Sequence, residues 1–120
     1  MSDRSLRERD YLGHMLDAVR QIEAYTRAKT QDDFHADRLL QDAVIRNIEI
    51  LGEASRKLLE SVPDVTARFG AIPFAAINAM RNQLAHGYFA VDLDIVWKVI
   101  ERDLPVLKKQ LELALDDLEK

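Results

Sequence analysis

Three residues of this sequence, Arg81, His86 and Tyr88, have types and a spacing that suggest chemistry. His86 follows Arg81 by five positions, and Tyr88 follows His86 by two. Between Ala71 and Val91, Arg81 is the only formally charged side chain, although charged residues make up 32% of the whole chain. An apolar neighbourhood strengthens the electrostatic interactions of such a guanidinium. A lone permanent charge near a histidine therefore marks a candidate site.

These residue types could cleave a phosphodiester without a metal. Arginine presents a planar, permanently charged fork that fits two phosphate oxygens and stabilises charge developing on phosphorus. Histidine, whose ordinary pKa lies close to neutral pH, can take a proton from a ribose 2′-hydroxyl or give one to the departing 5′-oxygen. Tyr88 adds a stacking face and a hydroxyl, and Asn82 could hydrogen-bond substrate or fix the imidazole. We therefore expect a site that needs no metal and no other cofactor.

Helix geometry separates the two main residues. Five residues of an α-helix correspond to about 140° of rotation and about 7.5 Å of rise, so Arg81 and His86 do not share a face of a straight helix. Gly87 offers a solution, because a left-handed residue at the helix end lets the last turn swing His86 and Tyr88 toward the cleft that Arg81 reaches. One histidine also cannot serve as acid and base at once. A symmetric homodimer would bring two copies into one cleft, and we expect the site at that interface.

A purely structural interpretation of the same residues remains open at this point. In it, Arg81 pairs with a carboxylate from another helix, while His86 and Tyr88 are satisfied polar residues at a helix end. Ion-pair networks also place lone charges in apolar surroundings. Burial of Arg81 against a carboxylate would favour this interpretation, in which the protein is a four-helix adaptor.

The elements that must position these residues are predicted to be helices. With 120 residues, 48% of them hydrophobic, the chain suits one domain over 1–120, and only 4 Gly and 3 Pro argue against a turn-rich β fold. Apolar residues recur at helical spacing in four long segments, and Pro105 predicts a kink in the last of them. We predict an all-α, up-and-down four-helix bundle with an extra short helix. The predicted helices are 3–29, 33–60, a short turn at 64–69, 73–87, and one that starts at Asp92 or Asp94.

Residues outside the motif carry weaker signals. Gly52 lies inside the second predicted helix, where glycine costs stability, and so suggests the close approach of another backbone across a dimer interface. Asp92 and Asp94 form a D-x-D pair of the kind that holds Mg²⁺ in nucleotidyltransferases. No Gly-Ser motif precedes the pair, and its place at a helix start predicts a capping role. His14 and His35 lack partners at metal-ligand spacing, so we expect surface or core positions for them.

Overall charge and composition limit the partners. The formal charge of −4 argues against bulk nucleic-acid binding, so an RNA site has to be local. Arg46 and Glu49 on the second helix could line such a site. The absence of Cys fits a reducing compartment, and neither an export signal nor a membrane-spanning stretch is evident. We expect a cytoplasmic protein without membrane contact.

The string from Arg81 to Tyr88 resembles the R-x4-H-x-Y signature of the HEPN superfamily. Its flanks, AVIRNIEILGEAS within 42–55 and RNQLAHGYFAVDLDIVW within 80–97, are similar to the HepT branch. This resemblance implies a metal-independent endoribonuclease that acts on RNA as the toxin of a toxin-antitoxin pair. It also implies a homodimer with the motif at the dimer cleft, in which Arg81 and His86 are catalytic and Asn82 is the supporting polar residue.

The resemblance further implies a partner. In HepT-like systems a minimal nucleotidyltransferase antitoxin silences the toxin by transferring AMP to the motif tyrosine, which here is Tyr88. The added nucleotide brings negative charge to the place where substrate phosphate must lie. The alternative is a non-catalytic HEPN module that binds nucleotide or a nucleotidyltransferase. A binding module could lose His86 without consequence, whereas a ribonuclease needs both Arg81 and His86.

Overall fold

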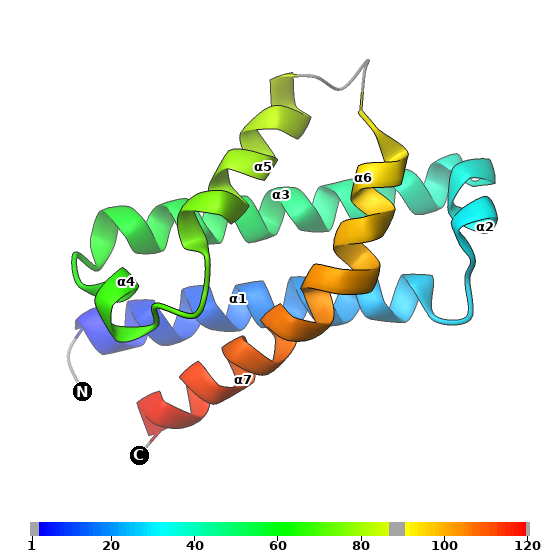
Figure 1. Ribbon diagram of the computed structural model, residues 1–120. Coiled ribbons are helices and arrows are strands. Elements are labelled where there is room, and N and C mark those ends of the chain that lie inside the picture. Colours follow the sequence, from blue (N-terminus) through cyan, green and yellow to red (C-terminus); the bar gives the residue numbers. More distant parts are fainter. Residues whose placement is uncertain (1–2, 87–90, 120) are drawn as a thin grey trace.

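The computed structural model describes the backbone of residues 3–86 and 91–119 and the side chains of 7–84 and 91–119. Within these ranges the chain forms helices and no strands, which confirms the all-α class (Figure 1). None of the described helices is both long and apolar enough to cross a membrane. In chain order the helices are α1 Asp3–Thr26, α2 Gln31–Ala36, α3 Arg38–Ser61, α4 Val65–Arg68, α5 Phe74–His86, α6 Leu93–Lys98, the π-helical turn η2 Val99–Asp103, and α7 Leu104–Glu119.

The two longest helices form the base of an elongated bundle. α1 and α3 run side by side in opposite directions, and the two chain ends lie at the same end of the molecule (Figure 1). α5 packs against α3, α7 packs against α1, and α2 contacts both α3 and α6. The principal extents are 46 × 29 × 20 Å. Four long helical segments with short connections agree with the predicted bundle, and the extra short helix at 64–69 is α4.

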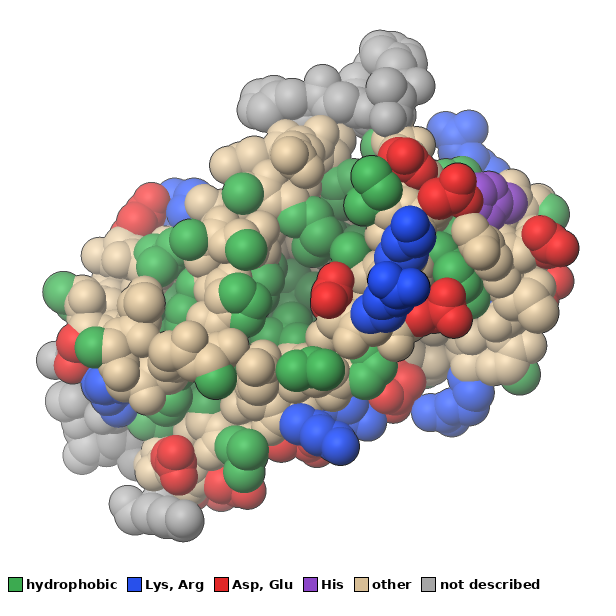
Figure 2. All heavy atoms as spheres, in the orientation of Figure 1, with side chains coloured by type: hydrophobic (Ala, Val, Ile, Leu, Met, Phe, Trp, Pro, Cys, Tyr) green, Lys and Arg blue, Asp and Glu red, His purple; other side chains and the backbone are tan. Residues whose placement is uncertain are grey.

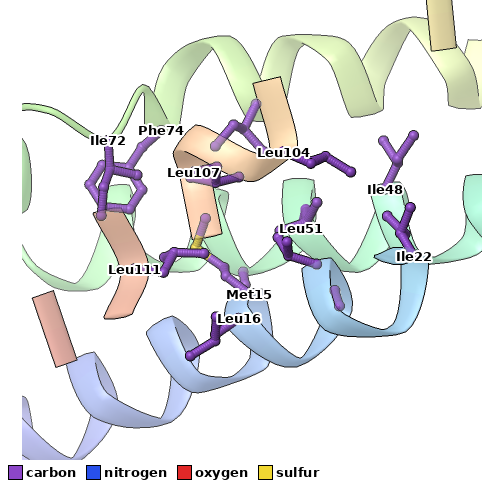
Figure 3. Close-up of a cluster of buried hydrophobic side chains, with 14 of the residues drawn as sticks. Met15, Leu16, Ile22, Ile48, Leu51, Ile72, Phe74, Leu104, Leu107 and Leu111 are labelled. Carbon is purple, nitrogen blue, oxygen red and sulfur yellow. The ribbon is translucent and has the colours of Figure 1, made fainter. Parts of the chain in front are cut away.

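The core lies between α1, α3 and α7 and continues toward the start of α5 (Figure 3). The apolar residues that recur at helical spacing in the first helix include Leu12, Met15 and Ile22, and all three are 0% exposed. The apolar residues Val44, Ile48 and Leu51 of α3 are also 0% exposed. In Figure 3, Ile48 lies beside Ile22 of α1, and Leu51 lies on the side of α3 that faces Leu104 and Leu107 of α7. Burial of these apolar residues is what holds the bundle together.

The second predicted helix, 33–60, is wrong as one element, because the chain breaks at Asp37. The backbone of Asp37 is extended (φ −120°, ψ 99°), and its carboxylate accepts the Leu40 N–H at 3.1 Å as the N-cap of α3. The shorter α2 has its own capping box. Thr30 accepts the Asp33 N–H at 3.1 Å, and the Asp33 carboxylate accepts the Thr30 N–H at 2.9 Å. Two sets of cap residues within eight positions divide the segment, although its apolar spacing continues across the break.

The last helix begins and bends where the sequence predicts. Asp92 is the N-cap of α6, and its carboxylate accepts the N–H groups of Asp94 and Ile95 at 3.0 and 3.3 Å, which confirms the capping role. The bend near Pro105 takes the form of the π-helical turn η2, in which the Leu104 N–H donates to the Val99 carbonyl. Proline has no N–H to continue an α-helical ladder, and a wider turn accommodates that loss.

Asp94 links the two short helices. One of its carboxylate oxygens accepts from Gln31 Nε2 at 2.8 Å and lies 2.9 Å from His35 Nε2. His35 is therefore a surface residue that contacts an acidic partner, as expected from its lack of metal-ligand neighbours in the sequence. The next layer inward is apolar, because the rings of Phe34 and Trp97 lie 5.5 Å apart beneath this contact.

A pair of leucines on α7 tests the assignment of the core. Leu111 is 0% exposed and Leu113 is 66% exposed. We expect Leu111→Ala to lower the free energy of unfolding by about 2–5 kcal/mol, because it leaves a cavity in the core. The matched variant Leu113→Ala should change it by no more than about 0.5 kcal/mol. Chemical denaturation followed by circular dichroism measures both, and equal losses would contradict the packing of α7 described above.

Candidate active site

Arg81 lies on α5 and is carried to the surface by the packing of that helix on α3. α5 buries Phe74 and Ile77 against the core, while Met80 and Leu84 are half-buried. The Arg81 side chain, one residue after Met80, remains 30% exposed. The apolar residues of the uncharged segment thus hold α5 against the core, and Arg81 is the one cation on this helix.

Gly52 of α3 lies directly beneath the stem of Arg81. A Cβ atom at position 52 would fall closer than 3.0 Å to both the Cβ and the Cγ of Arg81, and 3.2 Å from its Cδ. The prediction that this glycine marks a close approach is confirmed. The neighbour differs from the expected one, because it is a side chain of the same protomer and not a backbone across a dimer interface.

The head of Arg81 is held by two neighbours. Its Nη2 donates to Glu53 Oε2 at 3.2 Å, and its Nη1 donates to Asn82 Oδ1 at 3.0 Å. Glu53 also accepts two hydrogen bonds from Arg56, at 2.6 and 3.3 Å. The sequence predicted that Asn82 hydrogen-bonds substrate or fixes the imidazole. The structure adds a contact that the sequence did not suggest, in which Asn82 orients the guanidinium of Arg81.

The charges around Glu53 keep it ionised. Hydrogen bonding by Arg56 is the largest cause, and the nearby charges of Arg56, Arg81 and Lys57 add to it, so that the pKa of the Glu53 carboxyl lies below its ordinary value of 4.5 despite partial burial. Hydrogen bonds from Arg56 to Glu53 and to Glu60 in turn raise the pKa of Arg56. Arg81 therefore faces a permanent counter-charge at neutral pH.

The ion pair with Glu53 meets one requirement of the structural interpretation, since Arg81 does pair with a carboxylate from another helix. It does not meet the other, because Arg81 is not buried. Its side chain lines an open groove of about 580 Å³ between α1, α3 and α5. Its walls come from three helices: Tyr11 and His14 of α1, Arg46, Glu49, Ile50, Glu53, Ala54 and Lys57 of α3, and Arg81 of α5. Arg46 and Glu49, considered as lining residues from the sequence, are both part of it.

A second cavity on the other side of α5 has a different character. It has a volume of about 380 Å³, and its lining includes Leu51, Ile77, Met80 and Leu107, with Asp103 as its one charged residue. Figure 2 shows hydrophobic side chains gathered in a hollow on this face, between α5 and the limb formed by α6 and α7. α5 thus separates an apolar cavity from the polar groove that contains Arg81.

The remaining motif residues are only partly visible. His86 is the last residue of α5. Positions 81 and 86 are therefore about 140° apart around one helix axis. The side chain of His86 lies outside the described residues, as do Tyr88 and Gly87, which was expected to close the helix. Of the predicted site residues, the structure therefore shows a contact between Arg81 and Asn82 only, because the side chains of His86 and Tyr88 are outside the described residues.

Several residues at the groove were not predicted from the sequence as site residues. Glu53, Lys57 and Tyr11 come from helices other than the one that carries the motif. The one sequence signal for Glu53 is its position next to Gly52. The sequence predicted a surface or a core position for His14, and the structure shows that His14 is exposed. Its ring forms an edge-to-face contact with the ring of Tyr11. Among the side chains at 7–84 and 91–119, no group of three His, Asp or Glu could hold a metal ion.

Comparison with known proteins assigns the family. Residues 15–114 match the family described as Ribonuclease HepT-like, and the chain belongs to this family. It is 41% identical over 110 residues to a Methanocaldococcus jannaschii protein named "Gamma-glutamylcyclotransferase and putative RNase". The aligned region covers 92% of this chain and 48% of that relative, so this chain spans about half the length of the relative. It is 38% identical over 104 residues to "Probable ribonuclease HepT" of Thermococcus cleftensis, with 87% and 92% covered. No solved structure matches the chain significantly.

Two glycines in long helices give a direct test of the contact under Arg81. We expect Gly52→Ala to lower the free energy of unfolding by about 1–3 kcal/mol, because the new methyl group collides with the Arg81 stem. Gly13→Ala on α1 should instead raise it by up to about 1 kcal/mol, since nothing lies within 4 Å and alanine favours the helix. Urea denaturation of both variants measures this, and a stabilising Gly52→Ala would disprove the close approach.

The pH dependence of stability tests the Glu53 ion pair. Because the folded-state pKa of Glu53 is lowered, its stabilising effect is present above the ordinary value of 4.5 and is lost as the pH falls through the folded value. The difference in free energy of unfolding between wild type and Glu53→Gln should therefore be constant from neutral pH down to 4.5 and shrink below it.

The control for this titration is Glu101→Gln. Glu101 is exposed and makes no ion pair with any side chain that the structure describes. Because this substitution leaves the Glu53 ion pair intact, the acid-dependent loss of stability assigned to that pair should remain in the variant. A Glu53→Gln difference that stays unchanged into acid would show that the carboxylate is not held by the arginines in solution.

Proposed function

We propose that the protein is a metal-independent endoribonuclease that acts as the toxin of a toxin-antitoxin pair, with residues 1–120 as a single domain. The observation that carries the proposal is the position of Arg81 in a member of the HepT-like family. Its guanidinium stands at an open groove, held in place by Glu53 and Asn82, and 30% of its side chain remains accessible. A purely structural arginine would have no need of the groove.

Arg81 supplies the electrostatic part of the reaction. With Nη2 on Glu53 and Nη1 on Asn82, its stem and plane are fixed before substrate binds. A phosphate oxygen can then share the exposed N–H groups of the fork. Because the guanidinium is already oriented, charge developing on the phosphorus is stabilised without reorganisation of the site.

His86 supplies the proton transfers. As base it takes the proton of a ribose 2′-hydroxyl, whose oxygen attacks the phosphorus. As acid it gives a proton to the 5′-oxygen that leaves, so that a cyclic phosphate and a free 5′-hydroxyl result. One imidazole cannot hold both roles at the same moment. We therefore propose a homodimer in which two motifs share one cleft, an arrangement that also suits the separation of about 140° between positions 81 and 86 on α5.

A minimal nucleotidyltransferase is the proposed antitoxin, acting in the cytoplasm on Tyr88. Transfer of AMP from ATP forms a bond between the tyrosine oxygen and the α-phosphorus and releases pyrophosphate. The phosphate that remains on Tyr88 carries negative charge seven residues from Arg81 in the chain. Like charge and bulk at that point would compete with the substrate phosphate.

Cleavage of a mixed RNA pool in EDTA tests the enzymatic proposal. We expect wild type to cut, and Arg81→Ala and His86→Ala each to lose at least about 100-fold in rate, because each removes one essential part of the chemistry. Arg102→Ala, at an exposed arginine of η2, is the matched control and should cut like wild type. Circular dichroism of each variant verifies folding, and light scattering shows whether the active form has twice the mass of one chain.

The same assay decides between enzyme and binding module. Mass spectrometry first establishes that Tyr88 of the purified protein is unmodified. If such protein cuts none of the RNAs, the ribonuclease proposal fails, and a HEPN module that binds nucleotide or a nucleotidyltransferase becomes the better account. If wild type and both motif variants cut equally, the activity belongs to other residues or to a contaminant.

A further inference from the structure

The groove at Arg81 extends well beyond the motif. Its walls include Tyr11 and His14 from the first helix and Lys57 from the third, none of which belongs to the R-x4-H-x-Y signature. Its volume of about 580 Å³ is larger than that of the apolar cavity on the other side of α5, about 380 Å³. There is therefore room beside the Arg81 guanidinium for more than a single phosphate group.

The charges of this groove favour an anion. Three permanent cations, Arg46, Lys57 and Arg81, stand against two carboxylates, Glu49 and Glu53. Both carboxylates already face arginines, since Glu49 lies 3.7 Å from Arg46 and Glu53 accepts from Arg56 and Arg81. Lys57 makes no ion pair with any side chain in the described ranges. In a chain of formal charge −4, this groove is a local site of positive surplus.

The α1 wall adds an aromatic surface. Tyr11 and His14 are three residues apart on one face of the helix, with ring centroids 6.1 Å apart and ring planes at 83°. Tyr11 is half-buried and His14 is exposed. The edge-to-face contact fixes the two rings and leaves ring surface accessible at the groove. Aromatic faces beside a cationic track are the two components that bind single-stranded nucleic acid without reading its sequence.

We infer that a single strand of RNA binds along this groove. Its phosphates lie against Lys57 and Arg46, and one base stacks on the Tyr11–His14 pair, so that the neighbouring phosphodiester is held at Arg81. The inference rests on the proposed function in taking RNA as the ligand, and it assigns substrate-binding roles to residues outside the motif. A duplex fits less well, because its bases are already stacked on one another and cannot reach the α1 rings.

Binding of an uncleavable strand separates this inference from catalysis. The probe is a short fluorescently labelled 2′-O-methyl oligonucleotide of mixed sequence, which lacks the attacking hydroxyl, and the measurement is anisotropy with wild-type protein in EDTA. We expect His14→Ala to weaken binding about 5- to 10-fold through lost stacking. Lys57→Ala should weaken binding and reduce the slope of log affinity against log salt by about one.

Matched controls come from other faces of the molecule. Lys109→Ala on α7 removes an exposed lysine outside the groove, and it should leave both the affinity and the salt slope unchanged. The same oligonucleotide annealed to its complement should bind more weakly than the single strand. Since His14 is exposed and Lys57 lies at a groove, neither substitution removes core packing, and circular dichroism verifies this.

The outcomes distinguish the two proposals. If wild type cuts RNA but His14→Ala and Lys57→Ala bind the probe as tightly as wild type, the groove assignment is overturned and the ribonuclease proposal stands. If these variants lose binding while wild type never cuts, the groove assignment stands and the catalytic proposal fails. Equal affinity for single and double strands, or no binding of the probe by wild type, also overturns the assignment.

Discussion

The contact between Gly52 and Arg81 is the constraint on which the site depends. α5 can approach α3 closely only because position 52 has no side chain, and the stem of Arg81 occupies that space. The next residue, Glu53, then meets the guanidinium. Gly52 thus leaves space for the Arg81 stem, and Glu53 provides the counter-charge for its guanidinium. A glycine inside a long helix costs about 1 kcal/mol relative to alanine, a cost that the packing of the two helices offsets.

The helix that carries Arg81 divides the molecule into two environments. Ile77 and Met80 face an apolar cavity bordered by Leu107, while Arg81 faces the polar groove. The buried positions of α5, Phe74 and Ile77, have to be apolar because a charge there would be buried against the core. Arg81 is the one charged residue of α5, so the carboxylate that pairs with it comes from α3, where Glu53 is shared with Arg56.

Local patterns in the sequence were enough to predict the helices, the cap at Asp92, the bend near Pro105 and the close approach at Gly52. The break at Asp37 was missed, because apolar residues recur at helical spacing on both sides of it and a cap carboxylate looks like any surface Asp. The groove was missed for a different reason. Tyr11 and Lys57 are 46 residues apart and meet only through the packing of α1 on α3, which no short pattern encodes.

The groove at Arg81 holds three cations and two carboxylates, in a chain whose formal charge is −4. A polyanion that approaches from a distance is therefore not steered toward this protein, in contrast to the association of basic nucleic-acid binders. At physiological ionic strength fields decay within about 8 Å, so attraction begins only when a phosphate has reached the groove itself. For the RNA strand proposed to bind here, long-range attraction therefore adds little to the rate of association, which depends on collisions at the groove itself.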